Sequence, residues 1–276
     1  MSFAQGVMLG ITICFINQKG GCGKSSTCFH LAGYLAQSGL RVLLIDADPQ
    51  GSLSQGFLGS NIVESLEPGE TLATLFRGDA FAGLATLATN TPIGNIQLVP
   101  ANQHLAAWNT PSPEELGLRQ FTLASLLEPT HDYDVTLIDC PPNLYACSWN
   151  ALLAADCVVI PVPPEDFGTQ GLRAVLQAIE QAGQLNPRLT LLGLLVTRMD
   201  RRLLVHRAYE QKLRRLYGET VFETIVPEAA AFKVALACRQ PVSHYSPRSG
   251  AAAAMATMAT ELRNRIHRQQ ICRSVA

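Results

Sequence analysis

The sequence has no closely spaced pair of cysteines and no long apolar run. Its eight cysteines stand at positions 14, 22, 28, 140, 147, 157, 238 and 272, and none has the CxxC spacing typical of zinc sites and redox pairs. We therefore expect buried free thiols instead of disulfides or metal ligands. No segment approaches the ~20 apolar residues that a membrane-spanning helix needs. A disulfide scaffold and a transmembrane protein are thus not expected.

The sequence also lacks an internal repeat, a Pro- or Ser-rich linker and a recognisable secretion signal. Its 276 residues are 47% hydrophobic and 16% charged, as in an ordinary globular protein. We expect one domain over residues 1–276, with a core from about 11 to 270, in the cytoplasm. No segment before the first predicted strand is long enough for a helix-turn-helix, so operator-specific DNA binding is not expected.

The charge of the chain is nearly balanced overall but unevenly distributed. The formal net charge is −1. Residues 198–276 contain 14 Lys and Arg against 6 Asp and Glu, a balance of +8, whereas residues 1–197 contain the other 7 and 16, a balance of −9. A basic C-terminal part favours contact with a polyanion. Arginines that only solvate late helices would give the same balance, so both interpretations stay open.

Short apolar runs alternate with amphipathic stretches along the chain. Strands are predicted at 11–16, 41–46, 96–101, 134–139, 157–162, 189–197 and 222–226; helices are predicted at about 25–38, 168–184 and 203–217, followed by two late helices, the last at about 249–269. Residues 59–95 are expected to form loops around one short helix. Strands separated by helices predict an α/β fold, with a mostly parallel twisted sheet flanked by helices on both faces.

A glycine-rich segment, GGCGKSS, follows the first predicted strand and opens the first helix. Glycines let a loop bend around a phosphate, and the helix N-terminus attracts its negative charge. In such a loop Lys24 contacts the β- and γ-phosphates, the Ser25 hydroxyl binds Mg²⁺, and Ser26 contacts the α-phosphate. A glycine turn with chance lysines is the alternative, and the flanking strand and helix disfavour it. The predicted phosphate-binding residues are Gly20, Gly21, Cys22, Gly23, Lys24, Ser25 and Ser26.

Carboxylates follow two of the other predicted strands. Asp139 ends the run DVTLID, and Asp46 and Asp48 come at the end of RVLLIDAD. The carboxyl ends of parallel strands meet at one edge of a sheet, where ligands of open α/β folds bind. Asp139 is therefore expected to hold Mg²⁺ through water. Asp46 and Asp48 could simply solvate a loop, but their place favours a role in positioning Mg²⁺ or water.

Several long segments together resemble one protein family. NQKGGCGKSS, RVLLIDADPQGSLSQGFLG, YDVTLIDCPPNLYACSWNALLAADCVVIPVPPEDFGTQGL and PVSHYSPRSGAAA are similar to the ParA/Soj branch of the ParA/MinD ATPases, over residues 11 to 265 in one order. This resemblance implies a single-domain P-loop NTPase with a deviant Walker A loop. It also implies ATP and Mg²⁺ as cofactors, weak partner-stimulated hydrolysis of ATP to ADP and phosphate, and a role in DNA or plasmid partition.

The resemblance also implies roles for individual residues. Two chains are expected to form a sandwich dimer around two ATP molecules, in which Lys19 reaches the phosphates bound by the partner chain. Lys19, Lys24 and Asp48 are then the catalytic residues, with Asp48 orienting the attacking water. The implied metal-site residues are Ser25, Asp46 and Asp139. Arg198, in the segment TRMD, and Pro227 fall where related proteins line the base pocket.

The expected output of such an ATPase is nucleotide-dependent binding to non-specific DNA on the nucleoid. A ParB-like or cargo-adaptor protein with a basic tail is expected to stimulate hydrolysis. The candidate DNA-binding residues are Arg201, Arg202, Arg214, Arg215 and Arg263, near further basic residues at 207, 212, 265 and 268. The chain departs from the family pattern at VPEAAAFK, where arginines are usual and Glu228 stands instead, with Lys233 as a partial substitute.

Two other outputs occur in proteins with this type of loop. MinD-like regulators bind membranes or protein surfaces through a C-terminal amphipathic helix, but ELRNRIHRQQICRSVA has only Leu262 and Ile266 as spaced large apolar residues. Membrane binding is therefore disfavoured. Iron proteins of nitrogenase bridge a cluster with two cysteines per chain. Cys140 follows Asp139, but no second cysteine stands in a suitable glycine-rich context, so this output is also disfavoured.

Overall fold

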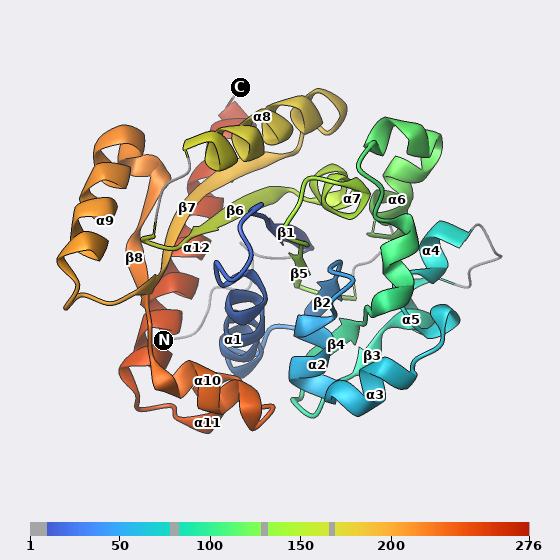
Figure 1. Cartoon of the computed structure of the whole chain (residues 1–276), viewed down its shortest axis with the longest axis horizontal. Helices are drawn as coiled ribbons and strands as arrows, with labels where there is room; N and C mark the ends of the chain where they lie inside the picture. Colours follow the sequence, from blue (N-terminus) through green and yellow to red (C-terminus); the bar gives the residue numbers. More distant parts are fainter. Residues whose placement is uncertain (1–9, 78–82, 128–131, 166–168, 276) are drawn as a thin grey trace.

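An eight-stranded sheet runs through the middle of the protein (Figure 1). The computed structural model describes residues 10–77, 83–127, 132–165 and 169–275. The strands are β1 (Ile11–Phe15), β2 (Val42–Asp46), β3 (Thr89–Asn90), β4 (Ile96–Val99), β5 (Val135–Asp139), β6 (Cys157–Val162), β7 (Thr190–Met199) and β8 (Val221–Pro227). Their order is β3-β4-β2-β5-β1-β6-β7-β8, and β3 pairs antiparallel with β4 while the other pairs are parallel. The predicted mostly parallel sheet is confirmed.

Helices cover both faces of this sheet (Figure 1). The helices are α1 (Lys24–Gln37), α2 (Ser52–Leu58), α3 (Ser60–Ser65), α4 (Thr74–Arg77), α5 (Leu84–Leu87), α6 (Thr122–Leu127), α7 (Ala146–Ala154), α8 (Thr169–Leu185), α9 (Leu204–Tyr217), α10 (Ala230–Ala237), α11 (Val242–Tyr245) and α12 (Gly250–Val275), with 3₁₀ turns η1 (Pro68–Glu70), η2 (Gln103–Trp108), η3 (Pro113–Phe121) and η4 (Gly218–Thr220). Residues of α4 to α9 belong to one apolar core, and residues of α1, α2 and α10 to α12 belong to the other.

The central strands are apolar along their whole length because both of their faces are covered. All residues of β1, β2 and β5 are buried. Successive side chains alternate between the two cores: Cys14 lies in the first, and Ile13 and Phe15 lie in the second. Of the described cysteines, Cys14, Cys22, Cys28, Cys140, Cys147 and Cys157 are buried thiols outside any disulfide, as predicted, whereas Cys238 is exposed. The side chain of Cys272 lies outside the described residues.

The prediction for two parts of the chain was wrong in detail. The described parts of residues 59–95, which are 59–77 and 83–95, contain three short helices, one 3₁₀ turn and β3, where one short helix was expected. After β8 the chain forms three helices instead of two, because Val242–Tyr245 adds a single turn. Segments of four to six residues are too short to show a helical period. They are stabilised by tertiary contacts instead, such as the burial of Leu75 and Phe76 against the sheet. The predicted start of α8 at residue 168 lies outside the described residues.

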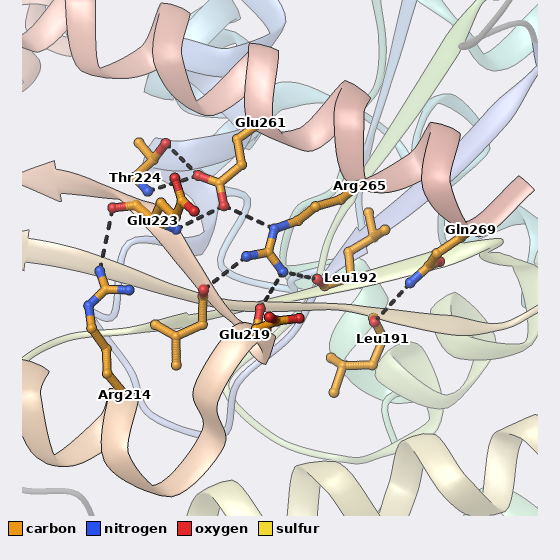
Figure 2. A network of polar contacts seen from close by, with 10 residues as sticks. Leu191, Leu192, Arg214, Glu219, Glu223, Thr224, Glu261, Arg265 and Gln269 are labelled. Atoms are coloured by element: carbon orange, nitrogen blue, oxygen red, sulfur yellow. Dashed lines mark hydrogen bonds and ion pairs between the residues drawn. The ribbon is translucent and has the colours of Figure 1, made fainter. Parts of the chain in front are cut away.

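The C-terminal helix α12 is fastened to the edge strand β8 through two charged side chains (Figure 2). Arg265 donates hydrogen bonds to the backbone carbonyls of Leu192, Glu219 and Val221 at 2.9–3.0 Å. The Glu261 carboxylate accepts the backbone N–H groups of residues 223 and 224 at 2.8 Å and also the Arg265 Nε–H at 2.9 Å. The pair thus satisfies backbone groups on the open edge of the sheet, which would otherwise be free to pair with another strand.

Replacing Arg265 with alanine is expected to lower the free energy of unfolding by about 2–3 kcal/mol. The change leaves backbone carbonyls of β7, β8 and η4 without their donor and removes the stacking of the guanidinium on Phe222, 4.3 Å from the ring centroid. Urea denaturation measures the loss. Arg268→Ala is the matched control, since Arg268 is exposed on the same helix and its loss should change stability by less than about 0.5 kcal/mol. Equal losses in the two variants would contradict this role.

Candidate nucleotide and magnesium site

The glycine-rich loop lies between β1 and α1, near the middle of the sheet. Gly21 and Gly23 have left-handed backbones, with φ of 69° and 91°, which glycine adopts without steric cost. Gly23 is the N-cap of α1, and no side chain caps the first turn of this helix. The backbone N–H groups at its N-terminus are therefore available to an anion, as the sequence predicts for a phosphate loop.

Lys24 points into this loop. Its side chain is buried, and its ammonium donates to the carbonyl oxygens of Asn17 at 3.1 Å and Lys19 at 3.3 Å and lies 3.8 Å from the Cys22 sulfur. Carbonyl oxygens are neutral acceptors that phosphate oxygens, which are charged, can replace with a gain in electrostatic energy. Lys24 is thus positioned to bind an anion held in the loop.

A cavity of about 490 Å³ opens from the loop. Its walls are the loop and the start of α1, the residues after β2, the ends of β7 and β8, and α10. Of the predicted nucleotide-binding residues, the cavity wall includes Gly20, Gly21, Cys22, Gly23, Lys24, Ser25, Ser26, Arg198 and Pro227. Lys19 is not among the described residues of this wall. The volume lies within the range of sites for small ligands and cofactors.

Part of the cavity wall is apolar. Val226 and Pro227 at the end of β8 and Phe232 and Leu236 of α10 line the cavity. Phe232 and Leu236 are four residues apart and so lie on one face of the helix. A cavity with apolar side chains and a cationic loop in its wall is complementary to a nucleotide, whose base is flat and weakly polar and whose phosphates are charged.

Asp139 ends β5 at the same level as Asp46 at the end of β2 and Phe15 at the end of β1. Its carboxylate is fully buried, and neither oxygen has a hydrogen-bond partner of normal geometry among the described residues. Burial raises the pKa of Asp139 well above its ordinary value, and the nearby charge of Asp46 adds to this rise, whereas the Ser25 hydroxyl and Lys24 oppose it.

A buried carboxylate that accepts no hydrogen bond of normal geometry from the described residues fits a metal ion. Both oxygens of Asp139 are in this situation, and Ser25 in the first turn of α1 supplies a hydroxyl oxygen nearby. Mg²⁺ prefers such oxygen ligands and keeps several of its waters when it binds one or two protein groups and phosphates. Asp139 and Ser25 would hold the ion, which supplies positive charge beside the phosphates.

Asp46 differs from Asp139 in that its oxygens already have partners. It accepts the backbone N–H and the hydroxyl of Ser54 at 2.8 and 2.7 Å, and the backbone N–H of Asp48 at 3.1 Å. Burial raises the pKa of Asp46 to about 7, and the Ser54 hydrogen bonds oppose this rise. Asp46 therefore ties β2 to α2 and to the turn that carries Asp48. This arrangement favours a positioning role, and its predicted role at the metal stays a prediction.

Asp48 lies on the cavity wall, as an acid that orients water would. Its side chain is 8% exposed, and its Oδ1 accepts the backbone N–H of Gln50 at 2.9 Å. Burial raises the pKa of Asp48, whereas Lys24 lowers it. One carboxylate oxygen is held by the turn, and the other is left to accept a proton-bearing ligand from the cavity.

Lys19 has different surroundings from Lys24. Its ammonium lies 3.5 Å from the carboxylate of Glu165, and the two side chains are 42% and 50% exposed. A surface ion pair of this kind is worth about 0–1 kcal/mol and is easily exchanged. Two lysines of one loop thus have different surroundings, because Lys24 is buried in its own chain's cavity and Lys19 faces the surface.

The candidate DNA-binding arginines are exposed to different degrees. Arg201 and Arg202 follow β7, and Arg202 makes an ion pair with Asp200 at 2.8 Å. Arg215 is exposed on α9, whereas the neighbouring Arg214 is bound to Glu210 at 2.6 Å and to the Glu223 carbonyl. Arg263 lies on α12, partly buried. Arg265, which the sequence placed in the same basic set, is turned inward by the network of Figure 2, so its expected place on a basic surface is wrong.

Sequence reasoning missed several residues of the site. Asn17 fixes the start of the loop, because its amide donates to the Pro161 carbonyl at 2.7 Å and accepts the Lys19 backbone N–H at 3.0 Å. Its place directly after β1 is the signal that could have identified it. Gln50, Ser52, Pro142, Phe232, Lys233 and Leu236 also line the cavity. The i, i+4 spacing of Phe232 and Leu236 is a pattern that could have indicated that α10 contributes to the site.

The chain is similar to a family model described as an AAA domain (AAA_31), over residues 10–191. It is 35% identical over 255 residues to the chromosome-partitioning ATPase Soj of Thermus thermophilus, covering 92% of this chain and 96% of that protein. It is 34% identical over 256 residues to the chromosome partitioning protein ParA of Caulobacter vibrioides, covering 90% and 92%.

Solved structures have the same fold. Cobyrinic acid a,c-diamide synthase from Mycobacterium smegmatis, with a bound ATP analogue and magnesium, has a TM-score of 0.75 at 28% identity, covering 91% of this chain and 92% of that one. McdA of Cyanothece in complex with ATP has a TM-score of 0.77 at 22% identity, covering 91% and 96%. The cofactors of the present protein are ATP and Mg²⁺, and its reaction is ATP hydrolysis. The chain belongs to the AAA_31 family and is a ParA-type partitioning or positioning ATPase.

Proposed function

We propose that ATP joins two copies of this chain into a sandwich dimer that binds non-specific DNA, and that partner-stimulated hydrolysis releases it. In this proposal residues 1–276 act as one ATPase domain. The observation that carries the proposal is the placement of the two loop lysines. Lys24 lies in its own chain's cavity, whereas Lys19 has a 42% exposed side chain whose one ion pair among the described residues is with the exposed Glu165. An exposed lysine can contact phosphates bound to a second chain.

Each polar residue of the cavity has a separate role in ATP hydrolysis. Lys24 and the N–H groups at the start of α1 bind the β- and γ-phosphates, Ser26 contacts the α-phosphate, and Ser25 and Asp139 hold Mg²⁺. Asp48 orients the attacking water toward the γ-phosphate. Lys19 of the partner subunit adds positive charge where negative charge spreads over the phosphate oxygens in the transition state. Hydrolysis stays slow until all these groups are aligned.

The base contacts the apolar part of the cavity wall. Val226, Pro227, Phe232 and Leu236 form this part. Arg198 also lines the cavity and donates to the Gly21 carbonyl of the loop, so its guanidinium is expected to lie near the ribose of a bound nucleotide. Because these four side chains are apolar, they support binding of a purine base by packing, with few polar contacts.

The DNA surface is proposed to lie on the turn after β7 and on α9, with Arg263 of α12 as a further contact. Arg201, Arg202, Arg207, Lys212 and Arg215 are all exposed there. Such residues contact phosphates without reading sequence, which suits a protein that moves along a nucleoid. Arg214 contributes less, because Glu210 neutralises it. The stimulating partner is proposed to be a ParB-like or cargo-adaptor protein, and the site of action is the nucleoid.

The experiment that tests this function uses the Asp48→Ala variant, random-sequence duplex DNA, and ATP or ADP across a salt series. The variant should hydrolyse ATP at least ~100-fold more slowly and so remain in the ATP-bound dimer. We expect DNA binding, measured by fluorescence anisotropy, with ATP but not with ADP, and a loss of affinity of about 100-fold or more between 50 and 200 mM salt.

Two arginines at opposite ends of β7 provide the matched variants. In the Asp48→Ala background, Arg201→Ala should lower the salt slope by about one unit, whereas Arg188→Ala should leave it unchanged. A dimer that forms with ATP but does not bind DNA would overturn the DNA part of the proposal and would favour a protein or membrane partner. Undiminished hydrolysis would remove Asp48 from its proposed role. None of the helices within the described residues is long and apolar enough to span a membrane.

A further inference from the structure

Two consecutive residues at the end of β7 donate hydrogen bonds to backbone carbonyls of the phosphate loop. The Thr197 hydroxyl donates to the Cys22 carbonyl at 2.7 Å, and the Arg198 Nη1 donates to the Gly21 carbonyl at 2.8 Å. The members of each pair are more than 170 residues apart in the sequence. Thr197 is buried, and its methyl group lies 3.8 Å from the Cβ that Gly23 would carry.

Holding these two carbonyls also sets the direction of two N–H groups. In a trans peptide the C=O and the following N–H point in opposite directions. When Arg198 holds the Gly21 carbonyl, the Cys22 N–H is directed to the other side of the loop; Thr197 does the same for the Gly23 N–H. Within the described residues neither N–H donates to a protein acceptor. Two aligned, unpaired N–H groups in a glycine loop form an anion site.

Arg198 is itself held in an unusual conformation. Its φ is +54°, in the left-handed region that non-glycine residues seldom enter because the Cβ crowds the backbone there. Its Nε donates to Glu228 Oε2 at 3.1 Å, and the Glu228 backbone N–H donates to the Met199 carbonyl at 2.9 Å. The strained residue is thus fixed on both sides, by the loop and by the end of β8. Strain kept in place by contacts of this kind is typical of functional sites.

Glu228 is the link between this contact and the base side of the cavity. Its second oxygen lies 2.6 Å from the Lys233 ammonium of α10. Lys233 and Arg198 together keep the pKa of Glu228 below its ordinary value, so the carboxylate is ionised at neutral pH. The residue that departs from the family pattern therefore connects α10, β8 and the loop through charged contacts.

We propose that Thr197 and Arg198 are positioning residues for ATP, which aim the Cys22 and Gly23 N–H groups at the phosphates, and that Glu228 holds Arg198 in this role. The inference rests on the proposed placing of the phosphates in the loop. It replaces the expectation that Arg198 binds the base. It also gives the acidic residue at 228 a function, since Glu228 fixes the guanidinium that would otherwise be free to rotate.

The test measures the affinities of ATP, inorganic tripolyphosphate and adenosine for the full chain by calorimetry in Mg²⁺. Thr197→Val keeps the branched shape but loses the hydroxyl, and Arg198→Ala loses the guanidinium. Each should weaken ATP and tripolyphosphate about tenfold and leave adenosine within about twofold. Thr197→Ser, which retains the hydroxyl, should bind tripolyphosphate as the unmodified protein does.

Other outcomes would overturn the inference. If Arg198→Ala weakens adenosine and ATP equally and spares tripolyphosphate, Arg198 binds the base. If Glu228→Ala strengthens tripolyphosphate binding, Glu228 acts only through the repulsion between its negative charge and the phosphates, and it does not position Arg198. Arg198 is 43% exposed on its side chain, so its variant should fold even where Thr197→Val does not. Lys24→Ala is the reference: if it leaves tripolyphosphate binding unchanged, the placing of the phosphates in the loop is itself wrong.

Discussion

Replacing Lys19 with alanine is expected to abolish the proposed ATP-dependent dimer while leaving the affinity of the single chain for ATP within about threefold. Lys19 does not belong to the described wall of its own cavity, and within the described residues its side chain makes one contact, an exposed ion pair with Glu165. Its loss should therefore remove little from nucleotide binding. A cross-subunit lysine that stabilises charge on transferring phosphates is worth about 10³-fold or more in rate, so hydrolysis should fall by at least ~100-fold.

Analytical ultracentrifugation with ATP checks this result in the Asp48→Ala background, where hydrolysis no longer removes the nucleotide. Glu165→Gln is the matched control. It breaks the same surface contact but leaves the lysine, so the dimer should form at least as readily as before. A normal dimer in Lys19→Ala would refute the role of Lys19 across the interface. Loss of the dimer in both variants would show that the dimer needs the ion pair between Lys19 and Glu165, and not a contact of Lys19 with the partner's phosphates.

Replacing Asp139 with asparagine is expected to stabilise the metal-free protein and to disable the enzyme. The Asp139 carboxylate is fully buried and accepts no hydrogen bond of normal geometry from the described residues, so its charge opposes folding when Mg²⁺ is absent. Asparagine removes that charge at nearly the same volume. We expect the free energy of unfolding to rise by about 1–3 kcal/mol at pH 8. Mg²⁺-dependent hydrolysis should fall at least ~100-fold, because a neutral amide is a poor ligand for a hard cation.

The sign of the pH dependence follows from the direction of the pKa shift. The pKa of Asp139 is raised in the folded state, so its contribution to stability is fully present below its ordinary value near 3.8 and is lost as the pH rises through the folded value. The advantage of Asp139→Asn should therefore grow with pH. Urea denaturation in EDTA at several pH values measures it.

The other end of β5 provides the control for this prediction. Asp134 precedes the strand and pairs with Arg41 at 3.0 Å, which holds the pKa of Asp134 below its ordinary value. Its contribution to stability is present above the ordinary pKa and is lost as the pH falls. Asp134→Asn should thus destabilise the protein at pH 8, in the opposite direction to Asp139→Asn, and should spare hydrolysis. A loss of stability in Asp139→Asn would mean that the buried carboxylate has a partner.

The local features of this protein were determined by its sequence. The phosphate loop, the strands on either side of it and the acids at the ends of β2 and β5 all follow from residues that are neighbours in the chain. Glycines set the backbone of the loop, and an apolar run that ends in an aspartate predicts a buried strand with a carboxylate at its end. The positions of Lys24, Asp48 and Asp139 could therefore be predicted before the fold was known.

Only the tertiary structure decided what the charged side chains contact. Arg265 looked like part of a basic surface, yet it satisfies the carbonyls of β7 and β8 (Figure 2). Asp46 and Asp139 have similar sequence surroundings, but Ser54 donates hydrogen bonds to the first, whereas the second accepts none of normal geometry from the described residues. The hydrogen bond from Arg198 to the Gly21 carbonyl joins two residues that are far apart in the sequence and meet only in the folded protein. The partners of a side chain depend on its distance from other segments in the folded protein, and this distance cannot be read from the spacing of residues along the chain.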